Sequence, residues 1–201
     1  MITDYLEDNL IEQPAIGIFR SLGYDYLNCF DETFGENSTL GREASSDVVL
    51  ISKLKPALIK LNPKLPLEAI SKAIDILIAD RSILNPAVAN KEVYKQIKEG
   101  VKVSFRNKSA KGGDEEVEDV VKVIDFENPK ENDFFLASQF WITGDLYKRR
   151  PDLVVFINGL PLILIELKGT HRKLENAFYD NLKDYNDTIP QIFWYNVFII
   201  L

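Results

Sequence analysis

The sequence contains a single cysteine, Cys29, and a single histidine, His171. A disulfide framework needs paired cysteines and a Cys/His zinc site needs several such ligands, so both are excluded. No segment approaches the roughly 18–20 uninterrupted apolar residues of a membrane span. The N-terminus, Met-Ile-Thr-Asp-Tyr-Leu-Glu-Asp, is acidic and unlike a basic signal sequence. We therefore expect a cytoplasmic protein with no membrane partner.

Basic residues are also in the minority. The chain has 24 Lys and Arg against 31 Asp and Glu, which gives a formal net charge of −7. Tight non-specific binding to a polyanion needs basic surface, so this balance argues against it. It does not exclude nucleic acid as a substrate, because basic residues can be local. Lys148-Arg149-Arg150 and His171-Arg172-Lys173 are two such clusters.

The first half of the chain has the apolar spacing of helices. With 201 residues, 46% of them hydrophobic and 27% charged, the chain is long enough to bury a substantial core in one or two domains. Pro14 is expected to kink or split the first helix, and the segment 24–39 is interpreted as a loop that can include a short strand. We expect a structural helical layer over about residues 1–99. The predicted helices span 3–22, 46–60, 67–79 and 90–99.

From residue 101 the pattern changes to the alternation of strands, and we expect a sheet-based core over about residues 100–201. The polar segment 107–116 is predicted to be a mobile hairpin loop rather than a nucleic-acid patch. The class is therefore α/β. Because the sequence stops inside its most apolar stretch, we expect 1–201 to be a fragment of a longer chain. Strands are predicted at 101–105, within 117–126 and 134–143, and as a buried strand at 192–201, with a helix at 174–185.

The most informative stretch is a predicted central hairpin. Two strongly apolar runs, 153–157 and 162–167, flank Asn158-Gly159, which is the strongest short hairpin signal. Runs this apolar are typical of strands buried on both faces. Asp152 and Glu166 nevertheless lie at their outer ends. Burying an ionised carboxylate is costly unless it is paired or binds a metal, so these acids need an explanation.

The length of the hairpin loop decides whether the two acids meet. A strict two-residue loop would pair Asp152 with Ile165 and send the acids to opposite faces. A three-residue loop would place Asp152 opposite Glu166. We predict the longer loop, because Pro161 would then be the first residue of its strand, where proline is tolerated. Lys168 would share the face of Glu166, since side chains alternate along a strand.

Two carboxylates at this separation suit a hard divalent ion such as Mg²⁺, with the carbonyl group of Leu167 as a further ligand. Bound Mg²⁺ lowers the pKa of a water ligand, and Lys168 would orient or deprotonate the attacking water. This chemistry is metal-assisted phosphodiester hydrolysis. The structural alternative is that Asp152 caps a turn while Glu166 and Lys168 form an ion pair at a strand end.

Three segments around the predicted hairpin form a recognisable pattern: Arg-Arg-Pro-Asp at 149–152, Asn-Gly-Leu-Pro-Leu at 158–162 and Ile-Glu-Leu-Lys at 165–168. They resemble the nuclease signature of one known family, the R (motor) subunit of Type I restriction enzymes. That signature is a version of the PD-(D/E)xK motif. Further segments that resemble the family lie at 45–50, 61–63, 134–140, 189–193 and 195–196. The resemblance thus covers most of the chain.

The resemblance implies a restriction-endonuclease-like core, with a central mixed β-sheet flanked by helices and an N-terminal helical layer. It also implies a Type I site-specific deoxyribonuclease that cuts double-stranded DNA with Mg²⁺. ATP would bind only to translocase domains beyond this sequence, and the partners would be methyltransferase and specificity subunits. Asp152 and Glu166 would hold the metal and Lys168 would be catalytic. The acidic residue of the first helix maps best to Glu7, with Glu12 as its rival.

One position departs from the family pattern. Many relatives carry Gln-x-x-x-Tyr on the helix after the Lys, and the matching residues here are Asn181 and Tyr185. The i,i+4 spacing places both on one helix face, but Asn reaches one methylene less far than Gln. Tyr185 is expected to assist the nuclease, with ordinary core packing as the alternative.

Two other functions fit the same residues. One is a nuclease of the same superfamily that acts in DNA repair or recombination without a translocase. A Walker A sequence downstream would favour the motor subunit, and none occurs within these 201 residues. The other is a non-catalytic docking module, for which nicking activity would survive Asp152→Ala and Lys168→Ala.

Overall fold

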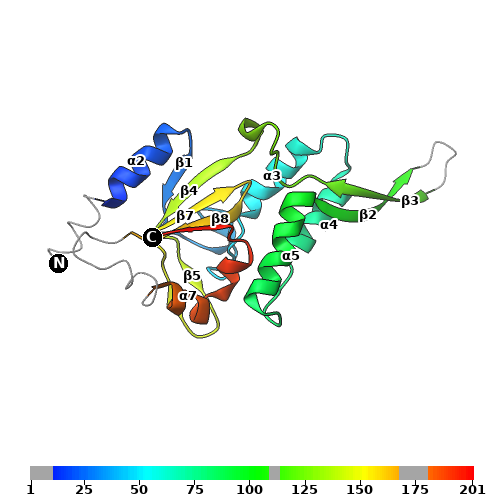
Figure 1. The fold of residues 1–201 in the computed structure, drawn as a ribbon. Coiled ribbons are helices and arrows are strands. Elements are labelled where there is room, and N and C mark those ends of the chain that lie inside the picture. The colour runs from blue at the N-terminus through cyan, green and yellow to red at the C-terminus, as the bar shows by residue number, and fades with distance from the viewer. Residues whose placement is uncertain (1–10, 109–113, 168–180) are drawn as a thin grey trace.

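The computed structural model describes residues 11–108, 114–167 and 181–201 (Figure 1). Its helices are α2 (Gln13–Ser21), α3 (Ile51–Leu61), α4 (Leu67–Leu77), α5 (Pro86–Glu99) and α7 (Lys183–Thr188), with 3-10 helices η2 (Gly35–Asn37), η3 (Pro129–Glu131) and η5 (Pro190–Trp194). Its strands are β1 (Asp25–Asn28), β2 (Val101–Lys108), β3 (Asp114–Val121), β4 (Phe134–Ser138), β5 (Ile142–Thr143), β6 (Lys148–Arg149), β7 (Leu153–Ile157), β8 (Leu160–Ile165) and β9 (Phe198–Ile200). Within these residues no helix is long and apolar enough to cross a bilayer.

The central sheet has five strands in the order β1-β4-β7-β8-β9. The outer pairs, β1–β4 and β8–β9, are parallel, while β4–β7 and β7–β8 are antiparallel. The sheet is therefore mixed and flanked by helices, which confirms the predicted α/β class. The segment interpreted as a loop at 24–39 supplies β1, an edge strand of this sheet.

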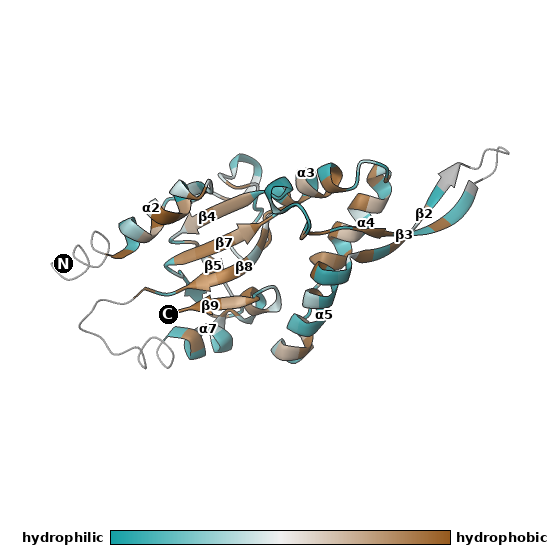
Figure 2. Cartoon of the chain, turned by 45° about the horizontal axis from the view of Figure 1, so that its top comes forward, coloured by the Kyte–Doolittle hydropathy of each residue, from teal (hydrophilic) through white to brown (hydrophobic). Residues whose placement is uncertain are grey.

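The predicted central hairpin is confirmed as β7 and β8, which lie in the interior of the sheet. All of β7 except Ile157 and all of β8 except Ile163 are buried. Figure 2 shows β4, β7 and β8 as mainly apolar ribbons between the helices. Burial on both faces explains why these runs are apolar without alternation.

The two faces of the sheet have different covers. Leu153 and Val155 of β7 pack in a small cluster with Ile16 of α2. Val154 and Phe156, which alternate with them, belong to the larger core that also includes residues of α3, α4 and α5. Alternate residues along β7 and β8 therefore pack against opposite helical layers.

The turn of the β7–β8 hairpin has two residues, so the predicted three-residue loop is wrong. Asn158 and Gly159 have φ of 51° and 79°, as a type I′ turn requires. The N-terminus of α3 packs directly on this turn: the Gly159 carbonyl group accepts a 2.9 Å hydrogen bond from the Leu50 N–H group. A Cβ atom at Gly159 would lie 2.4 Å from the Leu50 carbonyl oxygen and 2.7 Å from the Leu54 nitrogen, so a larger residue would push α3 away.

A β-bulge restores the pairing that the longer loop was expected to supply. The register shifts by one residue beside Pro161, which lacks the N–H group that a regular ladder would use. Pro161 is the second residue of β8 rather than the first. Beyond the bulge Leu153 pairs with Ile165. Continued by one residue, this register places Asp152 opposite Glu166.

Two helices begin elsewhere than predicted. Helix α3 begins later than residue 46 because the preceding residues form a turn, in which the carboxylate of Asp47 accepts backbone hydrogen bonds. Helix α5 begins earlier than residue 90. Asn85 caps it by accepting a 3.0 Å hydrogen bond from the Ala87 N–H group, and Pro86 occupies the favoured first position. Helix α4 begins at the predicted residue.

Two predicted helices are described only in part. For the helix predicted at 3–22, residues 1–10 lie outside the described part, and α2 begins at Gln13 with Pro14 in its first turn. For the helix predicted at 174–185, residues 174–180 lie outside it, and α7 continues past the predicted end to Thr188. Residues 11 and 12 are already π-helical, so the hydrogen-bond pattern of the helix changes just before Pro14.

Strands β2 and β3 form a separate hairpin that projects from the body in Figures 1 and 2. Both strands extend into the segment 107–116 that was predicted to be a loop, and residues 109–113 lie outside the described part. Val103 and Phe105 of β2 are buried in the core that includes α4. The hairpin projects away from the end of the sheet at which β7 begins.

The apolar C-terminal run is not the buried strand that the sequence predicts. Residues Pro190–Trp194 form η5, which packs on α5, and only the short edge strand β9 follows, with exposed side chains. The hydroxyl group of Tyr195 donates to the Leu77 carbonyl group at 3.0 Å, which holds this segment against the helices. An apolar run by itself does not distinguish a strand from a buried helical turn.

Candidate active site at the open end of the central hairpin

Asp152 lies immediately before β7 and links three strands of the site. Its carbonyl group accepts a 2.9 Å hydrogen bond from the Gln139 N–H group, just beyond β4. Its Oδ2 atom accepts a 2.8 Å hydrogen bond from the Leu167 N–H group, just beyond β8. The side chain is partly exposed. The carboxylate therefore faces the residues that follow β8.

Glu166 is the buried carboxylate of the site. The residue is only 1% exposed, and its N–H group donates to the Ile200 carbonyl group of β9 at 3.0 Å. Its Oε2 atom accepts a short hydrogen bond from the side-chain amide of Asn181. Asn181 therefore reaches the carboxylate although it is one methylene shorter than the Gln that the family resemblance would place there. A charge buried this deeply needs such polar partners.

Both acids lie on the face of the sheet that α7 covers. Because side chains alternate along a strand, Asp152 shares the face of Val154. Both acids raise the pKa of Tyr185, which is buried in the larger core. Burial, the charge of Glu166, a hydrogen bond to Glu166 and the charge of Asp152 all raise the pKa of Tyr185. The phenol is thus protonated at neutral pH and serves as a hydrogen-bond donor beside the two acids. The structure brings Asp152, Glu166, Asn181 and Tyr185 together.

An ion pair that the sequence prediction missed anchors α7. The guanidinium group of Arg149 in β6 binds the carboxylate of Asp184 through two hydrogen bonds, one of them 2.8 Å long between Nη2 and Oδ1. The hydrogen bond from Arg149 lowers the pKa of Asp184. Asp184 directly precedes Tyr185. The position of Asp184 next to Tyr185 in the sequence did not indicate that it pairs with Arg149, although Arg149 belongs to the Arg-Arg-Pro-Asp segment.

A second missed contact joins α2 to the end of β4. The side-chain amide of Gln139 donates a 3.0 Å hydrogen bond to Oε2 of Glu12, which is 9% exposed. Gln139 has φ of 55°, an unusual conformation for a residue other than glycine. Glu12, the rival assignment for the acidic residue of the first helix, is therefore tied to a residue whose backbone binds Asp152. The preferred assignment, Glu7, lies outside the described residues.

The donor chemistry of this site fits a hard cation. Asp152 and Glu166 offer carboxylate oxygens at the ends of adjacent strands. In the sequence, Leu167 lies between Glu166 and Lys168. Oxygen ligands of this kind suit Mg²⁺. Lys168 lies outside the described residues. In the described part of the chain no group of three or more His, Cys, Asp or Glu side chains could hold a metal ion, so a site here would use the two acids together with other oxygen donors.

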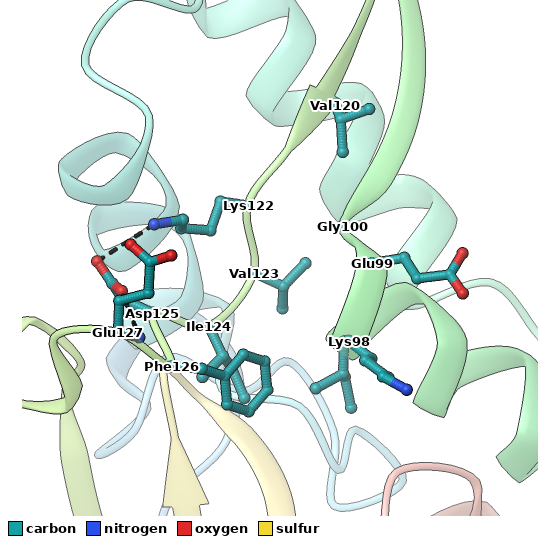
Figure 3. Close-up of a pocket in the computed structure, with 11 residues that line it drawn as sticks. Lys98, Glu99, Gly100, Val120, Lys122, Val123, Ile124, Asp125, Phe126 and Glu127 are labelled. Carbon is teal, nitrogen blue, oxygen red and sulfur yellow. Dashed lines mark hydrogen bonds and ion pairs between the residues drawn. The ribbon is translucent and has the colours of Figure 1, made fainter.

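A hollow elsewhere on the molecule is separate from these acids. It has a volume of about 340 Å³ and lies between the end of α5 and the segment after β3, with Lys98, Lys122 and Phe126 among its lining residues (Figure 3). Val123 in the same lining accepts a hydrogen bond from Asn158, at the turn end of β7. The open end of the hairpin, where Asp152 and Glu166 lie, is five strand residues from this turn end, or about 17 Å.

The mixed central sheet with its flanking helices has a restriction-endonuclease-like fold. The chain belongs to the family described as Type I restriction enzyme R protein N terminus, whose family model matches residues 4–201.

Two relatives illustrate the similarity. The chain is 32% identical over 199 residues to the Type I restriction enzyme HindI endonuclease subunit of Haemophilus influenzae. It is also 32% identical over 202 residues to a protein of Methanocaldococcus jannaschii provisionally named the type I restriction enzyme MjaIXP endonuclease subunit. The alignments cover 98% and 97% of this chain but 18% of each relative. The chain therefore spans less than a fifth of the length of these relatives.

Proposed function

We propose that this chain is the N-terminal endonuclease domain, residues 1–201, of the R subunit of a Type I restriction–modification enzyme. It hydrolyses phosphodiester bonds of double-stranded DNA with Mg²⁺. The observation that carries the proposal is the meeting of Asp152 and Glu166 at the open end of the central hairpin, in a chain of this family. Domains outside this sequence would bind ATP and translocate DNA, and methyltransferase and specificity subunits would be the partners.

Each residue has a distinct task in this proposal. Asp152 and Glu166 would hold the ion, with the carbonyl group of Leu167 as a further ligand. When bound, Mg²⁺ supplies Lewis-acid chemistry and a water of lowered pKa. Lys168 orients the attacking water or takes its proton, and its ammonium group offsets negative charge on the phosphorus oxygens. Tyr185 acts as the neutral donor that positions Glu166.

The contacts around Glu166 support the proposal over a purely structural role. A strand-end ion pair between Glu166 and Lys168 would not need the amide of Asn181 and the phenol of Tyr185 on the same carboxylate. These donors stabilise the ionised form in a buried setting. They leave a negative charge held in place beside Asp152, which suits a cation site.

The test is Mg²⁺-dependent nicking of plasmid DNA by the assembled enzyme that carries the Asp152→Ala change in this domain. We expect the rate to fall by at least about 100-fold, since even residues that only support metal ligands commonly matter 10–100-fold. Lys168→Ala should give a comparable loss. The matched control is Asp145→Ala, which removes an exposed carboxylate of the β5–β6 connection. Full activity in both Asp152→Ala and Lys168→Ala would leave the chain as a non-catalytic docking module.

A further inference from the structure

Beside the candidate active site lies a group of stacked cations and aromatic rings, which we call the cation–aromatic rim: Phe30, Trp141, Lys148 and Arg150. The Arg150 guanidinium carbon lies 4.8 Å from the ring centroids of both Phe30 and Trp141. The Lys148 Nζ atom lies 4.2 Å from the ring centroid of Trp141. Phe30 is 55% exposed, and Lys148 is exposed as well. These distances are those of cation–π contacts at an accessible surface.

The rim rests on a buried arginine that binds the backbone of Trp141 and the side chain of Glu32. Arg42 is 1% exposed, and its Nη2 atom donates to the Trp141 carbonyl group at 2.8 Å. Its Nη1 atom pairs with Glu32 at 2.7 Å, in the same loop that carries Phe30. The indole N–H group of Trp141 donates to the Phe30 carbonyl group at 3.0 Å. The rings therefore form a fixed support, and their contacts restrict the positions of the two cations.

Within the described residues neither cation of the rim forms a salt bridge with a carboxylate, although the charge of Lys148 acts on Glu32. Among residues 11–108, 114–167 and 181–201, no ion pair involves Lys148 or Arg150, whereas Arg149 between them is paired with Asp184. Stacking uses the face of the Arg150 guanidinium group and leaves the N–H groups at its edge for an acceptor. In a chain of net charge −7 the rim is thus a local positive site.

The position of the rim relates it to the acids. Arg150 is joined to Asp152 through Pro151, so their Cα atoms are at most about 7 Å apart. Along the helix axis, the phosphates of one DNA strand advance by about 3.4 Å per nucleotide. A phosphodiester at Asp152 would therefore bring phosphates one or two nucleotides away within reach of Arg150 and Lys148.

We propose that the cation–aromatic rim binds the backbone of double-stranded DNA next to the phosphodiester that is cut. The inference rests on the proposed function and adds to it the surface that positions the substrate. Lys148 and Arg150 donate to flanking phosphates, and Phe30 and Trp141 lower the entropy cost by holding both side chains in place. Backbone contacts of this kind fix register without reading sequence, which suits an enzyme whose recognition resides in another subunit.

The experiment measures binding of the protein to a fluorescein-labelled DNA duplex by anisotropy, in EDTA and over a series of KCl concentrations. The variant Lys148→Gln/Arg150→Gln is compared with Lys55→Gln/Lys64→Gln, which removes the same charge from exposed residues on and after α3. We expect the rim variant to weaken binding by at least about tenfold. It should also reduce the slope of log K against log salt by about 2, because two phosphate contacts are lost. The control should stay within about twofold of the wild type.

A second variant tests the support without changing charge. Trp141→Leu should weaken binding by about threefold, as expected for loss of an exposed cation–π contact, while thermal melting confirms that the variant folds. Equal losses in the rim and control variants, or no loss in the rim variant, would overturn the proposal. So would competition by poly-glutamate as effective as that by unlabelled duplex of equal charge, because the rim would then be a site for acidic peptides.

The assay separates this inference from the proposed function. Binding is measured without a divalent ion, so its outcome does not depend on whether Asp152 and Glu166 hold Mg²⁺. If nicking survives Asp152→Ala, the proposed function fails whatever the rim does. If nicking is lost but the rim variant binds normally, only the rim proposal fails.

Discussion

The two ends of the central hairpin both bury polar side chains, but they satisfy them differently. At the turn end Asn158 is fully buried, and its amide donates to the Val123 carbonyl group at 2.8 Å and to the Asn132 side chain at 2.9 Å. Its Oδ1 atom accepts a 2.7 Å hydrogen bond from the Asp133 N–H group. At the open end the buried group is the carboxylate of Glu166.

The difference separates a structural site from a chemical one. A neutral amide with matched donors and acceptors costs little to bury and holds three loops together. A carboxylate costs far more, and the donors around Glu166 support the charge rather than remove it. We therefore expect changes at the turn end to act on stability and changes at the open end to act on activity.

The largest effect is expected from Asn158→Ala at the turn end of the hairpin. It should lower the free energy of unfolding by about 3 kcal/mol, because the Asp133 N–H group and the Val123 carbonyl group lose their partners in the interior. Urea unfolding would show a lower midpoint with an unchanged slope. The control Asn128→Ala removes an exposed amide and should change stability by less than about 0.5 kcal/mol. Equal effects of the two changes would mean that the turn network is not structural.

A smaller effect is expected from Asn181→Ala at the open end. It should reduce Mg²⁺-dependent nicking by the assembled enzyme about tenfold, because Glu166 loses the amide that orients it. Asn181→Gln keeps the amide and should retain activity within about threefold. If Asn181→Ala cut DNA at the wild-type rate, the amide would be a packing contact only.

The smallest effect concerns the pH dependence of stability. The pKa of Tyr185 is raised in the folded state, so its contribution to stability is fully present below about pH 10, the pKa of an unfolded tyrosine. It is lost as the pH rises further, because the unfolded phenol releases its proton while the folded one retains it. In the range above pH 10, Tyr185→Phe should therefore lessen the decline by up to about 1.4 kcal/mol per pH unit.

Denaturant unfolding at several pH values checks this prediction. Tyr195, whose pKa burial raises to about 12, contributes a decline of the same sign in both proteins. The comparison is therefore the difference between wild type and Tyr185→Phe. Parallel curves would show that the phenol does not remain protonated beside Glu166.

Local patterns predicted the central hairpin well and its turn poorly. Asn158-Gly159 and the two apolar runs identified the strands, because burial on both faces leaves no polar alternation. The bulge at Pro161 was not predicted, since it depends on how β8 fits between two neighbours. In the structure the bulge, and not a three-residue loop, therefore places Asp152 opposite Glu166.

The rest of the site depends on contacts between distant segments. Asn85 and Pro86 carried a start signal for α5 that could have been recognised. No local pattern could have indicated that Arg149 binds Asp184, or that Gln139 binds Glu12, because these partners are brought together only when the layers pack. The apolar C-terminal run misled for the same reason: its aromatic residues serve the packing against α5.

Local spacing and burial were enough to predict the class of fold, the helical and strand periods and the acids at the hairpin's open end. Only the tertiary structure decided the register across the hairpin, the strand β1 at the edge of the sheet and the anchoring of α7 over Glu166. These depend on side chains far apart in the chain, whose contacts exist only once the sheet has formed between its two helical layers.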